Sequence, residues 1–277
     1  MNAGPADKGR PRAGRVRLAI DALTPFTRQA IESAVSLASQ GAVRLDCVFV
    51  EPLELFHAAS LPLTREFGMA IPSPRRLDRS ELERALQLQA GQAQRLLARS
   101  AGAVRIEHSF EVTRGALLDE ALRRAAEQDL LVVGAAGCEL DLPAAPRAHG
   151  REAQRTLLAL VESLPADLPT LRALLRAIPG ATLAICAAGE AADSAAGLEA
   201  QFDALERELG RPLRRLRGAA GPQPQLVAAA LAQALSELRP QLLTLRRETL
   251  AALATELAWA MRRRPALLVA TPKAVAQ

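Results

Sequence analysis

The chain has 277 residues, 49% of them hydrophobic, and this length predicts two domains that can each bury a core. It contains six Phe, one Trp and no Tyr, so those cores are expected to consist of Leu, Val and Ala. The scarcity of aromatic residues argues against binding of single-stranded nucleic acid by base stacking. The formal net charge is +5, but acidic residues are interleaved with the arginines, so neither a nucleic-acid surface nor a membrane surface is predicted.

Three isolated cysteines, Cys47, Cys138 and Cys186, lack the spacing of a disulfide framework or a zinc site. No apolar run reaches the roughly 18 residues of a membrane span, and the first residues lack the apolar core of a signal peptide. These features predict a cytoplasmic protein.

Strand and helix patterns alternate through the first half of the chain. Residues 1–14 predict a disordered lead-in, and the proline-rich residues 51–77 predict a long, partly ordered excursion. Strict alternation of apolar and polar residues at 104–112 indicates an edge strand. The other expected strands are residues 16–21, 43–50 and 129–133, and helices are expected to begin at Thr24-Pro25, at the capping box Ser80-x-x-Glu83 and after Gly115. This order predicts a doubly wound parallel α/β sheet.

The second half shows the same order in shortened form. Residues 182–186 resemble residues 17–21, and residues 241–245 resemble residues 129–133. Further strands are expected at 212–217 and 266–270, with helices between them. The fold class is therefore α/β, with two doubly wound, Rossmann-like parallel-sheet domains in tandem. The expected domains are residues 15–166 and 167–277.

The stretch between the two repeats is harder to assign. Residues 151–164 and 168–178 have helical patterns, yet the first repeat needs a fifth strand in this region. Residues 156–161 are one candidate for that strand, and the strand that begins at Thr182 is the other.

Two glycines, Gly134 and Gly137, end the buried strand at 129–133. Backbone N–H groups without side chains at such a turn can bind a phosphate. The structural alternative is a strand-to-loop turn that needs a positive φ and holds no ligand.

With the first strand ending at Asp21, the motif Val112-x-Arg114-Gly115 and residues 126–137, the first half resembles the universal stress protein family. The resemblance implies a nucleotide-binding fold of the adenine nucleotide alpha hydrolase-like class. It also implies that Asp21 and the backbone of Val50 hold adenosine, while Gly134 and Gly137 cradle the phosphates of ATP or a related adenine nucleotide.

The chain departs from the family pattern at several positions. After Gly-x-x-Gly and nine further residues, the family pattern has another glycine followed by Ser or Thr, where this chain has Arg147-Ala148. In the second repeat, Cys186, Arg246 and Thr249 are expected to replace Asp21, Gly134 and Gly137. The second repeat is therefore expected to be degenerate, with a structural or dimer-like role.

These observations predict a non-enzymatic stress-response protein that partly retains an adenine-nucleotide site in its first repeat only. Two alternatives stay open, a nucleotide-independent interaction scaffold and a weak ATP-hydrolysing or adenylylating enzyme. The three histidines, His57, His108 and His149, have no evident catalytic partners, so no catalytic residue and no metal site are predicted. The expected assembly is an intramolecular pseudo-dimer of the two repeats or a homodimer.

Overall fold

The computed structural model describes most of the chain, namely residues 14–68, 71–134, 156–162, 167–168, 171–172, 174–175, 182–189, 195–210, 212–220, 224–238, 240, 242–257 and 267–271. Its strands are β1 Val16–Ile20, β2 Leu45–Pro52, β3 Arg65–Gly68, β4 Ile71–Arg76, β5 His108–Gly115, β6 Leu130–Gly134, β7 Thr156–Val161, β8 Thr182–Gly189, β9 Arg214–Ala220, β10 Leu242–Arg246 and β11 Leu267–Thr271. Its helices are α1 Pro25–Gly41, α2 Leu53–Ser60, α3 Arg79–Ala103, α4 Leu117–Arg124, α7 Ala195–Leu209, α8 Pro224–Leu238 and α9 Arg247–Ala252.

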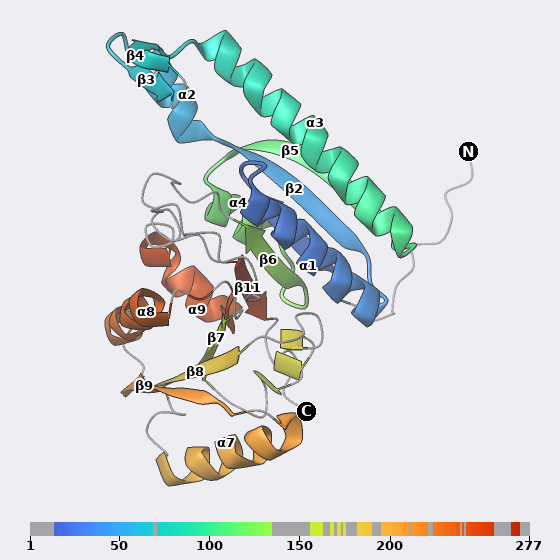
Figure 1. The fold of residues 1–277 in the computed structure, drawn as a ribbon, viewed down its shortest axis with the longest axis vertical. Coiled ribbons are helices and arrows are strands. Elements are labelled where there is room, and N and C mark those ends of the chain that lie inside the picture. Colours follow the sequence, from blue (N-terminus) through green and yellow to red (C-terminus); the bar gives the residue numbers. More distant parts are fainter. Residues whose placement is uncertain are drawn as a thin grey trace, which may run out of the picture.

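Nine of the described strands form one continuous sheet in the order β5-β2-β1-β6-β11-β10-β7-β8-β9 (Figure 1). Neighbouring strands are parallel except β6 and β11, which are antiparallel. The α/β class and the largely parallel sheet are as predicted. The two groups of strands share one continuous sheet rather than forming a sheet each, because β11 joins them through hydrogen bonds to β6 on one side and β10 on the other.

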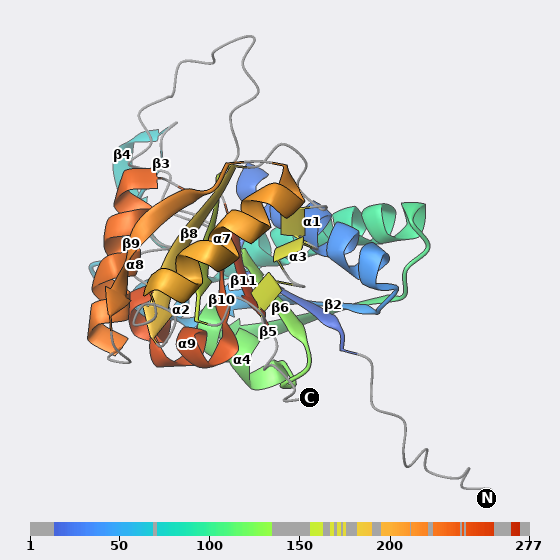
Figure 2. The ribbon, with the colours of Figure 1, turned by 90° about the horizontal axis from the view of Figure 1, so that it is seen from below.

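The sheet separates two apolar cores, since strand side chains alternate between its faces. One core includes side chains of α1, α3 and α7, and the other includes side chains of α4, α8 and α9. Helices therefore cover both faces, as the two views in Figures 1 and 2 show. Leu, Val and Ala supply most of these side chains, as the composition predicts.

The strand order is the same when it is followed inward from either edge. The first group is β5-β2-β1-β6 and the second is β9-β8-β7-β10, so β7 takes the place of β1 and β8 takes the place of β2. The proposed match between residues 182–186 and residues 17–21 is therefore wrong, because residues 182–186 belong to β8. Neither candidate for the fifth strand pairs with β6, and the strand that lies there is β11.

At the periphery of the first half, some elements agree with the sequence-based predictions and others differ from them. Strand β5 lies at the edge of the sheet as expected, although it begins at His108 rather than at residue 104. The excursion contains α2 and a β3–β4 hairpin beside α3 (Figure 1). Thr24 caps α1 as predicted, but the cap of α3 is Asp78, which accepts hydrogen bonds from the backbone of Ser80 and Glu81. None of the described helices has the length and apolar character needed to cross a membrane.

A buried carboxylate ties the start of β1 to the turn before β6. Asp129 accepts a 2.6 Å hydrogen bond from Arg17 Nε, a 2.8 Å bond from the backbone N–H of Ala126 and a 3.1 Å bond from that of Arg15. Burial by itself raises the pKa of Asp129, but these hydrogen bonds outweigh it and hold that pKa below its ordinary value. The ionised form is thus stabilised in the folded protein.

Asp129→Asn is expected to lower the free energy of unfolding by about 2 kcal/mol at neutral pH, because it removes a charge-assisted hydrogen bond. The folded pKa of Asp129 is depressed, so its contribution is present above the unfolded pKa of roughly 3.9 and is lost as pH falls through the folded pKa. The variant should therefore lose less stability than the wild type on acidification below pH ~5, as urea unfolding at a series of pH values would measure. Asp119→Asn, at an exposed site on α4, is the matched control and should follow the wild type. Equal acid sensitivity of Asp129→Asn and wild type would contradict this role.

Candidate functional site

The strand order reverses beside β1 in the first half of the sheet. The chain passes from β1 to β2 and β5 on one side, and then crosses to β6 on the other side of β1. In open α/β sheets, ligands bind at the carboxyl ends of the strands that flank such a reversal. The carboxyl ends of β1 and β6 are therefore the first place to look for a site.

Two of the residues predicted from the sequence meet at this edge. Gly134 pairs with Ile20, and Asp21 follows Ile20 directly. The chain then enters α1, whose cap residue Thr24 accepts a 3.2 Å hydrogen bond from the backbone of Thr27. Because the first turn of α1 contains no acidic residue, its positive end is not neutralised from within the helix.

The connection from β1 to α1 is anchored to α3. The backbone N–H of Leu23 donates a 3.1 Å hydrogen bond to Gln89 Oε1 on that helix. Thr27, in the first turn of α1, is fully buried, and its side chain bonds back to Thr24. These contacts fix the backbone that follows Asp21.

Packing explains why a glycine occupies position 134, and the sequence does not reveal this reason. A Cβ atom at this position would lie 2.8 Å from the Cβ of Ala30 on α1 and 3.3 Å from Cγ2 of Ile20. Among the glycines that the structure describes, positive φ occurs only at Gly210, so Gly134 does not serve a left-handed turn. It allows α1 to lie close against the end of β6. Gly137, Arg147 and Ala148 lie outside the described residues.

Val50 lies on the neighbouring strand β2, with its side chain fully buried. The ladder between β1 and β2 ends at Ile20 and Phe49, so Val50 extends one residue beyond it. A ligand at this edge would meet the backbone of Val50 rather than its side chain.

Sequence reasoning missed an ion pair at the carboxyl end of β2. Glu51, which is 8% exposed, accepts hydrogen bonds of 3.1 and 2.9 Å from Nε and Nη2 of Arg114. The Arg114 guanidinium lies 3.8 Å from the ring centroid of Phe56 on α2. The available signal was an acidic residue directly after the apolar run that ends at Val50. The pair links the carboxyl ends of β2 and β5, where Glu51 and Arg114 lie in register.

The second half carries the corresponding arrangement at the opposite edge, because β6 and β11 run in opposite directions. Glu162 follows β7 as Asp21 follows β1, and Arg246 ends β10 as Gly134 ends β6. The acidic residue is therefore retained as Glu162, and the expected replacement of Asp21 by Cys186 is wrong. Cys186 is a buried residue of β8.

Side chains fill the edge of the second half. Arg246 Nε lies 3.0 Å from Asp167 Oδ1, and its Nη1 lies 4.0 Å from Glu162 Oε2. The hydroxyl of Thr249 donates to Glu162, and Asp167 accepts a 3.2 Å bond from the backbone of Glu162. A cation of the chain itself thus lies between the two carboxylates, at the strand end that corresponds to Gly134 in the first half.

Metal-binding groups and histidines are the remaining candidates for chemistry in the part of the chain that the structure describes. No group of three or more His, Cys, Asp or Glu side chains there is placed to hold a metal ion. His57 is exposed, His108 is half-buried at the start of β5, and His149 lies outside the described residues.

Comparison with known proteins finds a similarity to solved structures. No family model and none of the curated proteins matches this chain. Among solved structures, the chain is similar to a universal stress protein from Archaeoglobus fulgidus DSM 4304, with 13% sequence identity and a TM-score of 0.48. The similarity covers 94% of this chain and 96% of that chain. Because the identity is this low, the roles of individual residues have to follow from the geometry of this chain.

Proposed function

We propose that this chain is a cytoplasmic, universal stress protein-like protein that binds an adenine nucleotide and catalyses no reaction. The observation that carries the proposal is the pairing of Ile20 with Gly134, which brings Asp21 and the start of α1 to the reversal point of the sheet. A carboxylate there can accept hydrogen bonds from ribose hydroxyls, and the positive end of a helix favours phosphate. The resemblance of the first half to the universal stress protein family supports the choice of an adenine nucleotide.

The proposal gives one nucleotide site per chain. In the second half, Arg246 crosses the equivalent edge and pairs with Asp167 and Glu162. A phosphate at that edge would meet two carboxylates and a side chain in place of a bare glycine backbone. The second half therefore serves as a structural partner in the same sheet.

Addition of ATP or ADP is expected to raise the melting temperature of the intact protein. Ligand at 100 times its Kd contributes about 2.7 kcal/mol, which corresponds to roughly 5 to 10 °C for a chain of this length. Asp21→Ala should abolish the shift, whereas Asp119→Ala, at an exposed site on α4, should retain it. An unchanged melting temperature of the wild type at millimolar ATP and ADP would disprove the proposal.

A nucleotide-independent interaction scaffold is the second candidate. Its supporting observation is a group of exposed leucines in and just after α2, namely Leu53, Leu55, Leu61 and Leu63. Exposed apolar side chains that gather on one short segment are typical of contact surfaces. Nucleotide absorbance near 260 nm that persists through purification would count against this candidate.

A further inference from the structure

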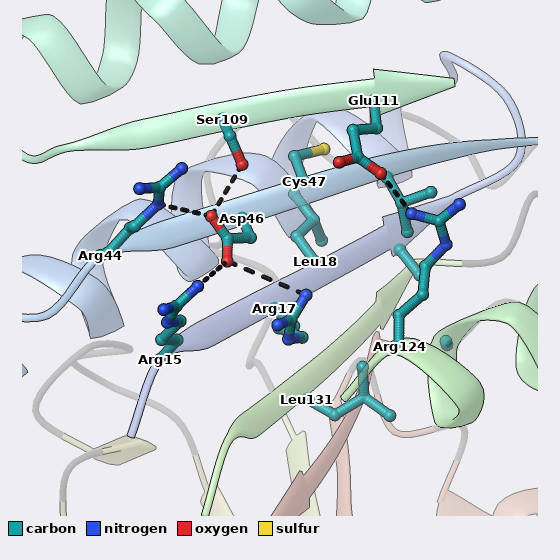
Figure 3. Close-up of a pocket in the computed structure, with 13 residues that line it drawn as sticks. Arg15, Arg17, Leu18, Arg44, Asp46, Cys47, Ser109, Glu111, Arg124 and Leu131 are labelled. Atoms are coloured by element: carbon teal, nitrogen blue, oxygen red, sulfur yellow. Dashed lines mark hydrogen bonds and ion pairs between the residues drawn. The ribbon is translucent and has the colours of Figure 1, made fainter. Parts of the chain in front are cut away.

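A groove at the amino-terminal portions of β1, β2 and β5 is separate from the proposed nucleotide site. Helix α4 has only eight residues, so part of the sheet face beneath it is left uncovered. The amino-terminal portions of β1, β2 and β5 line a cavity of about 250 Å³ there, with α4 at one side (Figure 3). Asp21 and Gly134 lie at the opposite side of the sheet, at the carboxyl-terminal ends of β1 and β6.

The floor of this groove is polar across three neighbouring strands. Arg17 of β1 pairs in register with Asp46 of β2, and Asp46 pairs with Ser109 of β5. Leu18 and Cys47, the next residues along β1 and β2, are buried in the apolar core on the other face. A polar row on a sheet face at a cavity is the arrangement of a binding surface rather than of a core.

Asp46 holds the surrounding arginines in fixed positions. Its Oδ1 accepts 2.7 Å hydrogen bonds from Arg44 Nε and Ser109 Oγ, and its Oδ2 accepts a 3.2 Å bond from Arg15 Nη1. Arg17 Nη1 lies 3.8 Å from the same Oδ2. Burial by itself raises the pKa of Asp46, but the hydrogen bonds from Ser109, Arg44 and Arg15 outweigh it and lower that pKa. The two oxygens of one carboxylate thereby accept hydrogen bonds from three side chains and form an ion pair with a fourth.

The arginines keep donors for an external acceptor. Each guanidinium has five N–H groups. Besides the bonds to Asp46, Nε of Arg17 donates to Asp129 and Nη1 of Arg44 donates to Glu107, and further N–H groups remain on each of the three side chains. Their side chains are 26 to 38% exposed, so solvent reaches them although their positions are fixed. Figure 3 shows these three side chains gathered about Asp46, with Arg124 reaching toward Glu111 on the other side. Four arginines line the groove together with Asp46 and Glu111, and three carboxylates outside the lining, Asp129, Glu107 and Glu120, also pair with them.

We propose that this groove binds a compact phosphate-type oxyanion, either free phosphate or the phosphoryl group of a small molecule. Planar guanidinium groups match the geometry of phosphate oxygens, and groups already held in place lose little conformational entropy on binding. The cavity of about 250 Å³ is smaller than the roughly 300 to 1,000 Å³ of pockets for drug-sized ligands, which favours a compact anion over a nucleotide.

Calorimetric titration of the intact protein with inorganic phosphate, at an ionic strength held constant with chloride, tests the proposal. Wild type is expected to bind phosphate, and Arg15→Gln combined with Arg44→Gln should weaken binding by about tenfold or more through loss of charge-assisted hydrogen bonds. Arg99→Gln, at an exposed site on α3, is the matched control and should bind as wild type does. Absence of binding by wild type, or equal binding by wild type and the double variant, would overturn the proposal.

A variant that strengthens binding separates the proposal from a general effect on folding. Glu111 pairs with Nη1 of Arg124, and Glu120 pairs with Nε of the same guanidinium. Glu111→Gln should therefore free the Nη1 end of Arg124 and tighten phosphate binding by about two- to fivefold. Unchanged or weaker binding by this variant would count against the groove.

Asp21→Ala should leave phosphate binding intact, so failure of the nucleotide site and failure of the groove are distinguishable. Phosphoserine in place of phosphate distinguishes the two sources, because tighter binding of phosphoserine assigns a phosphate monoester and tighter binding of phosphate assigns the free anion.

Discussion

Val269→Asp is expected to unfold both halves of the chain together. Val269 is fully buried in β11, where it pairs with Val132 of β6 on one side and with Thr244 of β10 on the other. An unpaired carboxylate at this position costs several kcal/mol, about as much as the whole stability of many domains of roughly 5 to 15 kcal/mol. Because β11 joins the two groups of strands, its loss removes a neighbour from each group.

Urea unfolding of wild type and variant, followed by circular dichroism, measures this effect. Wild type should unfold in one cooperative transition, and Val269→Asp should be largely unfolded without denaturant. Leu226→Asp, at a 47% exposed site in the first turn of α8, is the control and should change stability by only about 0.5 kcal/mol or less. Two transitions in wild type, of which the variant loses one, would instead indicate independent domains such as residues 15–166 and 167–277.

The identity of most strands could be predicted from the sequence, but their neighbours could not. Continuous apolar runs such as Leu130 to Val133 are typical of parallel strands that are buried on both faces, and these residues do form a central strand. Because these runs are uniformly apolar, the sequences of such strands resemble one another. The Leu-Ala-Ile shared by β1 and β8 therefore suggested an equivalence that the strand order contradicts, since β8 takes the place of β2.

The error in strand equivalence also concealed Glu162. The signal that singled out Asp21 was an acidic residue directly after an apolar strand, and Glu162 carries the same signal after β7. Residues 156–161 were within a pattern that also suited a helix, because short apolar runs do not distinguish the two structures. Only the pairing of β7 with β8 and β10 shows which edge Glu162 occupies.

The groove lined by Arg15, Arg17, Arg44 and Arg124 shows a second limit of prediction from the sequence. Arg17, Asp46 and Ser109 are visible as polar residues within or beside apolar runs, but they lie far apart in the sequence. Their common row depends on the register between three strands, and a shift of one residue would move a side chain to the opposite face. The direction of β11 is likewise set by tertiary pairing and has no mark in the sequence.

Gly134→Val is expected to lower the free energy of unfolding by about 3 kcal/mol in the absence of any ligand. The added Cβ would lie 2.8 Å from the Cβ of Ala30, and Ala30 is fully buried on α1. Either α1 moves away from β6 or the end of β6 shifts, and both changes disturb packing around Ile20. Urea unfolding of the nucleotide-free protein measures the loss directly.

A compensating substitution shows whether the contact with Ala30 is the cause. Ala30→Gly alone should cost about 1 kcal/mol through its lower helix propensity. Combined with Gly134→Ala, it should destabilise by less than the sum of the two single changes, because it removes the atom that the new Cβ meets. Additive effects would show that Ala30 is not the obstacle. If Gly134→Val instead kept wild-type stability and lost only the response to ATP, the glycine would serve the ligand alone, and the close approach of α1 would not explain it.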